Sequence, residues 1–69
     1  MTKKELEERL NHEPFEPFRI NTADGKNFDV MNPRLVVAME TRVFIALPKE
    51  NWTLIALRQV TRLEGLAAA

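Results

Sequence analysis

The segment FRINTADGKNFDV, from Phe18 to Val30, decides how this sequence folds. Apolar and polar residues alternate on both sides of Asp24-Gly25, which is the pattern of two strands that each bury one face. An Asp-Gly pair supplies the positive φ angles that a tight hairpin turn requires. A metal loop or phosphate cradle around Lys26 is a weaker alternative, because one glycine and two nearby carboxylates make a poor site. The segment therefore predicts a half-buried β-hairpin.

The residues before the hairpin predict one short helix and a stiff connector. Thr2 is followed three residues later by a glutamate, which is the spacing of a capping box. Leu6 and Leu10 share one face of a helix that we expect over residues 2–11. The prolines of residues 12–17 stop this helix and hold the connector extended.

The residues after the hairpin contain further short strands. The segments Leu35–Met39 and Val43–Leu47 are apolar on both faces, and they are too short and too β-branched to be helices. Trp52–Leu57 is another strand, and Val60–Glu64 follows it after a short break. One helix, the hairpin and these further short strands predict a mainly β, α+β fold in a single domain, residues 1–69.

The order of these elements resembles that of Sm-like and SH3-like proteins. The resemblance implies a five-stranded, strongly bent antiparallel barrel at residues 18–64, with the helix over one open end and a tail at residues 65–69. The predicted core consists of Phe18, Ile20, Phe28, Val30, Val37, Ile45, Leu54 and Val60, together with Leu6 and Leu10 from the helix.

The residue types argue against catalysis. Serine, cysteine and tyrosine are absent, which leaves five threonines as the hydroxyl side chains. His12 is the only histidine, and at a helix C-terminus it is explained by a favourable dipole contact. The carboxylates stand at turns, strand ends or exposed positions, without the spacing of a metal site or a paired-acid cleft. We therefore expect no enzyme, no metal and no cofactor.

The charge balance favours a protein partner over a nucleic acid. Ten basic and ten acidic side chains give a net charge of zero, whereas phosphate binding normally requires a basic excess. We therefore expect a non-catalytic interaction or structural module of unknown partner. The alternative is an Sm-like RNA-binding protein, as the resemblance implies. Its candidate contacts are Arg19, Lys26, Arg34, Arg58 and Arg62.

The strands with two apolar faces predict self-association. One helix with two leucines covers only part of one face of the strands. Some apolar surface would therefore stay exposed to solvent in a monomer. We expect a homo-oligomer, either a dimer or a closed ring, and the competing account is that a tightly closed barrel absorbs these residues. The expected interface residues are Val43, Ile45, Trp52, Leu54 and Leu57.

Three motifs resemble those of a group of short, uncharacterised bacterial proteins. They are PFEPFRI, DGKNFDV followed by NP, and QVTRLE, which together cover residues 14–33 and 59–64. The resemblance implies a bacterial domain and carries no activity. The longest apolar runs are five residues and no secretory signal is visible, so we expect a cytoplasmic protein with no membrane partner.

Overall fold

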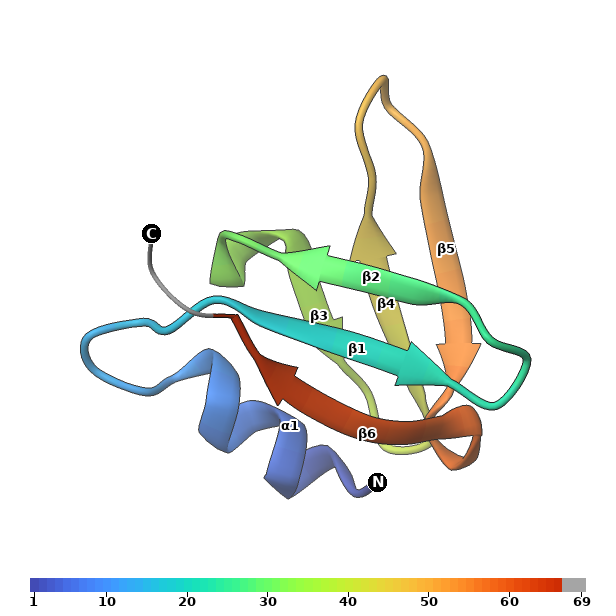
Figure 1. Cartoon of the computed structure of the whole chain (residues 1–69), viewed down its shortest axis with the longest axis horizontal. Coiled ribbons are helices and arrows are strands. Elements are labelled where there is room, and N and C mark those ends of the chain that lie inside the picture. Colours follow the sequence, from blue (N-terminus) through green and yellow to red (C-terminus); the bar gives the residue numbers. More distant parts are fainter. Residues whose placement is uncertain (67–69) are drawn as a thin grey trace.

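The computed structural model describes residues 1–66, and they form one helix and two antiparallel sheets of three strands each (Figure 1). The two sheets face each other, and their strands cross at a large angle. Residues 67–69 of the predicted tail lie outside the described residues. The elements are α1 (Lys3–Leu10), β1 (Phe18–Thr22), β2 (Asn27–Val30), η1 (Pro33–Leu35), β3 (Val36–Ala38), β4 (Arg42–Ala46), β5 (Trp52–Ala56), η2 (Leu57–Gln59) and β6 (Val60–Gly65).

The first sheet has the strand order β2-β1-β6, with the predicted hairpin as two of its strands. Phe18 lies opposite Val30 and Ile20 opposite Phe28, so the apolar side chains of β1 and β2 share one face. Gly25 has a φ of 85°, the left-handed conformation expected from the Asp-Gly turn. The predicted hairpin is therefore confirmed.

The second sheet has the strand order β3-β4-β5. A tight turn joins β4 to β5, and the amide of Leu47 donates to the carbonyl of Asn51 at 2.8 Å across it. Lys49 and Glu50 at the tip both have a φ of 62°. This is the left-handed region that a two-residue hairpin turn requires, here occupied by residues other than glycine.

Residues 1–66 form six strands, so the predicted count of five is wrong. The side chain of Asn32 accepts a hydrogen bond from the amide of Arg34 at 2.9 Å and starts the single turn η1. Pro33 has no N–H to give to a strand ladder. Asn32 and Pro33 therefore separate β2 of the first sheet from β3 of the second. Within residues 1–66, no strand pairing joins the two sheets.

The core lies between the sheets and contains six of the ten predicted residues, together with Val36, Val43 and Leu57, which were not predicted. Its buried side chains are Leu6, Phe18, Ile20, Val30, Val36, Val43, Ile45, Leu57 and Val60. Phe28 and Leu10 are partly buried and pack against it. Val37 and Leu54 were predicted to be buried, but they are 52% and 39% exposed. A strand that is apolar on both faces has no alternation to show which face turns toward the core. The prediction therefore placed Val37 and Leu54 on the wrong face.

Helix α1 closes one end of the core. Its N-cap is Thr2, whose hydroxyl accepts from the amide of Glu5 at 3.2 Å, as the capping box predicts. Leu6 is buried between α1 and the sheets, and the helix packs against β3. The guanidinium of Arg9 lies 5.7 Å from the centre of the Phe18 ring, within cation–π range. Within residues 1–66, no helix has the length and apolar character needed to cross a membrane.

We expect the first turn to depend on Gly25 for its backbone conformation. A Cβ added there meets no atom within 4 Å, so Gly25→Ala should destabilise the fold by about 1 kcal/mol through the positive φ alone. Gly65→Ala is the matched control, because its Cβ would meet only Arg9 at an ordinary 3.9 Å. Urea unfolding of both variants measures the difference. Equal stabilities would contradict the assigned turn.

Candidate interaction surface

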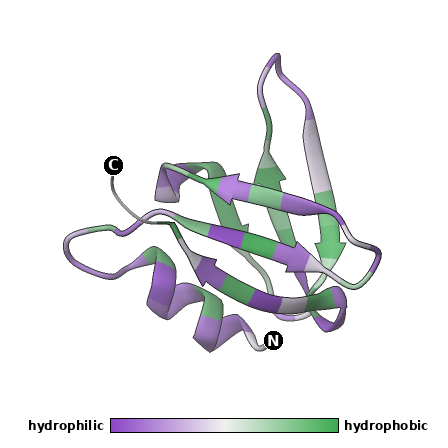
Figure 2. Cartoon of the chain, in the orientation of Figure 1, coloured by the Kyte–Doolittle hydropathy of each residue, from purple (hydrophilic) through white to green (hydrophobic). Residues whose placement is uncertain are grey.

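The outer face of the first sheet is polar, and its charges are paired. Arg19 donates through Nε to Oδ1 of Asp29 at 2.7 Å, across the β1–β2 pair. Oε1 of Glu64 on β6 accepts a hydrogen bond from the side-chain amide of Asn21 at 3.4 Å and lies 3.6 Å from a guanidinium nitrogen of Arg62. Figure 2 shows the matching pattern, with polar and apolar bands alternating along β1 and β6. This face is a solvated surface of balanced charge.

The outer face of the second sheet is apolar except for Arg42 at one end of β4. The strand registers place Val37, Phe44 and Leu54 in one row across β3, β4 and β5. Trp52 stacks on Phe44 with ring centres 5.8 Å apart and planes 24° apart, and it remains 63% exposed. We call these four residues the apolar face. Figure 2 shows β3 and β4 almost uniformly apolar. Large exposed aromatic and aliphatic side chains in contact mark interaction sites on protein surfaces.

The structure divides the predicted interface residues into two groups. Trp52 and Leu54 belong to the apolar face. Val43, Ile45 and Leu57 are 0%, 2% and 3% exposed, because they point into the core between the sheets. These three present no surface to a partner, so only Trp52 and Leu54 of the predicted set lie on an exposed face. Val37 and Phe44 lie on the same face as Leu54 and were not predicted there, because only the sheet registers of the structure place them on it.

The predicted nucleic-acid contacts lie on several elements, and only Arg19 and Arg62 share one face of a sheet. Arg19 and Arg62 are paired with carboxylates on the outer face of the first sheet. Lys26 follows the first turn, Arg34 is in η1, and Arg58 is in η2. Lys26 and Arg58 line separate hollows, and Arg34 lines neither of them. Phosphate recognition along a strand would need these charges on one surface.

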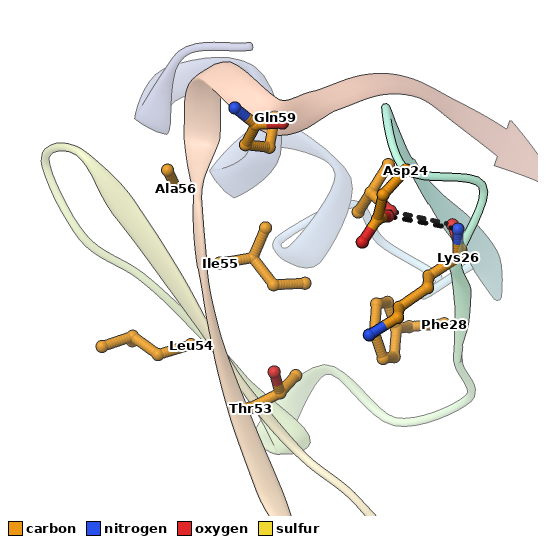
Figure 3. Close-up of a pocket in the computed structure, with 9 residues that line it drawn as sticks. Asp24, Lys26, Phe28, Thr53, Leu54, Ile55, Ala56 and Gln59 are labelled. Carbon is orange, nitrogen blue, oxygen red and sulfur yellow. Dashed lines mark hydrogen bonds between the residues drawn. The ribbon is translucent and has the colours of Figure 1, made fainter.

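A cavity of about 300 Å³ lies between β5 and the first hairpin (Figure 3). Thr53 and Ile55 point across it toward Lys26 and Phe28, whereas Leu54 points to the other side of β5. The cavity therefore borders the inner face of β5. Its lining residues are Thr22, Asp24, Lys26, Phe28, Thr53, Leu54, Ile55, Ala56 and Gln59.

The ionisable groups near the first hairpin are held by hydrogen bonds at the surface. The Thr22 hydroxyl and the amide of Lys26 both donate to Asp24, and they lower the pKa of this carboxyl below its usual range.

His12 lies outside the cavity lining, with Nδ1 2.8 Å from the carbonyl of Pro14 and 3.6 Å from Glu16. Within residues 1–66, no group of three or more His, Cys, Asp or Glu could hold a metal ion.

The Arg19–Asp29 pair gives a pH-dependent prediction. The hydrogen bond and the charge of Arg19 lower the pKa of Asp29, so the pair stabilises the fold above the ordinary carboxyl pKa of about 3.9. This contribution is lost as the pH falls through the lowered pKa of Asp29. A carbon-13 NMR titration of the carboxyl should give a midpoint below the ordinary value. Arg19→Gln should raise that midpoint and Arg62→Gln should not, and an unchanged midpoint in Arg19→Gln would contradict the pair.

Comparisons with known proteins found no match. No family model matches the chain, and no curated protein or solved structure is similar enough to match it. The resemblance to short bacterial proteins therefore stays a prediction.

Proposed function

We infer that this chain is a small, non-catalytic interaction module that associates with itself through its second sheet. The observation that carries the proposal is the apolar face, where the exposed Trp52, Leu54 and Val37 surround the half-buried Phe44 across three strands. Burial of apolar area is the main driving force for association between proteins. Aromatic side chains such as Trp52 are also enriched among the residues that dominate binding.

The contrast between the two outer faces supports this reading. The first sheet shows paired charges to solvent, whereas the second shows aromatic and aliphatic side chains. A soluble domain without partners has no need of such a face, because polar residues would serve equally well there. The row of exposed apolar residues across the strands of one sheet is therefore best explained by a binding surface.

The barrel-like plan is part of the same proposal. The chain turns at η1 from the first sheet to the second, and it returns through η2 between β5 and β6. β2 and β3 can be regarded as one bent strand interrupted at Pro33, which gives the helix and five bent strands of an Sm-like or SH3-like plan. The bacterial origin and cytoplasmic location implied earlier remain predictions that go with this reading.

The oligomeric state tests the proposal. We expect light scattering at micromolar concentration to give a multiple of the 8.0 kDa chain mass. Trp52 is the only tryptophan, so its emission should shift to the red when dilution separates the chains and exposes the indole. Trp52→Lys should give a single chain with little change in thermal stability, because this side chain is mostly exposed.

A matched control is available on the other sheet. Asn27→Lys adds the same charge at an exposed strand position outside the apolar face and should leave the oligomer intact. A wild-type mass of 8.0 kDa that persists on concentration would refute self-association. An oligomer unaffected by Trp52→Lys would place the interface elsewhere.

Filter binding with single-stranded RNA tests the nucleic-acid alternative. We expect no salt-sensitive retention, because Arg19 and Arg62 are paired with carboxylates and the other candidate cations are dispersed. Retention that weakens with salt and disappears in Arg58→Ala would favour the alternative. Lys4→Ala, at an exposed position in α1, is the charge-matched control.

A further inference from the structure

We propose that two copies of this chain pair antiparallel through the free edges of their β5 strands, about a twofold axis at Leu54. The pairing would join two three-stranded sheets into one sheet of six strands. This inference rests on the proposed self-association and specifies its geometry. The occupant of the β5 edge is therefore a second copy of the same chain.

The backbone of β5 has hydrogen-bonding groups that β4 does not use. The amide of Leu47 donates to Asn51 at 2.8 Å, and the amide of Leu57 donates to Thr41 at 2.9 Å. Antiparallel pairs alternate between hydrogen-bonded and non-bonded, so between these two bonds Thr53 and Ile55 bond to β4. The N–H groups of Trp52, Leu54 and Ala56 therefore point away from β4, toward the open edge.

β5 is the edge least protected against pairing with another strand. Asn51 to Leu57 contains no charged residue. The β2 edge carries Asp29, and the β6 edge carries Arg62 and Glu64. The β3 edge is three residues long and has α1 packed against it. Natural edge strands avoid association through charges, short length or a covering element, and β5 has none of these protections.

The sequence of β5 is complementary to its own reverse. With Leu54 opposite Leu54 of the second copy, Trp52 lies opposite Ala56 and Thr53 opposite Ile55. Each large side chain on the outer face then meets a small one or its own counterpart. The two Leu54 residues exchange two backbone hydrogen bonds, and each Ala56 amide donates to a Trp52 carbonyl.

Both faces of the strand leave room for this register. On the outer face, Arg42 of β4 lies directly opposite Ala56 of β5. The Trp52 indole of the second copy would lie next to Ala56 on its other side, within reach of the Arg42 guanidinium. On the inner face, the cavity of about 300 Å³ borders Thr53 and Ile55. The Ile55 side chain of the second copy would enter this cavity, where Phe28 provides an apolar wall (Figure 3).

Cysteine cross-linking tests the register, because the chain has no cysteine of its own. Only Leu54 meets its own counterpart across the axis, at a Cα separation of about 5.5 Å that a disulfide can span. Under mild oxidation, Leu54→Cys should convert most of the protein to a covalent dimer. Val37→Cys is the control, since Val37 is also part of the apolar face but lies on β3, two strands away from the β5 edge.

A mixing experiment fixes the strand direction. Trp52→Cys and Ala56→Cys should cross-link when mixed, and each should stay largely uncross-linked alone. Amide exchange provides a readout without substitutions: the Leu54 amide should exchange at least tenfold more slowly at concentrations where the dimer forms.

The outcomes separate this inference from the proposed function. A wild-type chain that stays at 8.0 kDa would overturn both. An oligomer in which Leu54→Cys fails to cross-link, or in which Val37→Cys cross-links equally well, would overturn only the β5 pairing. The latter result would indicate that the apolar faces stack on each other. A mass above that of a dimer would indicate pairing of β5 with a different strand.

Discussion

A chain of 69 residues has enough material to cover one face of each of its sheets, and this limit governs the rest of the structure. The inner faces meet around Phe18 and Ile20 of β1 and Val43 and Ile45 of β4, the central strands of the two sheets. Helix α1 and the connector close one end of this core. Nothing in residues 1–66 covers the outer face of either sheet, so each outer face must suit water or a partner.

The two sheets meet this condition in different ways. The first sheet carries charges that neutralise one another, as in the Arg19–Asp29 pair, and its carboxylates accept hydrogen bonds at the surface. The second sheet carries Phe44 and Trp52, which shield each other only in part. Stacking reduces the exposed apolar area but leaves most of the indole in solvent. The same limit of size that produces the core thus leaves an apolar surface available for association.

An edge and a face of one sheet act together in the proposed assembly. Backbone hydrogen bonds along β5 would supply direction and register, while Trp52 and Leu54 would supply apolar contact beside them. Lys49 and Glu50 at the β4–β5 turn keep β5 in register with β4. The β4–β5 hairpin thereby presents its free edge beside the apolar face.

The sequence by itself determined the elements whose signals are local. The alternation on both sides of Asp24-Gly25 specified the first hairpin, and Thr2 specified the start of α1. Tertiary structure decided which face of the strands with two apolar faces is buried. Either face of Leu35–Met39 or of Val43–Leu47 could have joined the core. Packing against Phe18 and Ile20 turned Val43 and Ile45 inward and left Trp52 and Leu54 outside. The candidate interface is therefore a property of the packed sheets, since the local pattern does not distinguish the two faces.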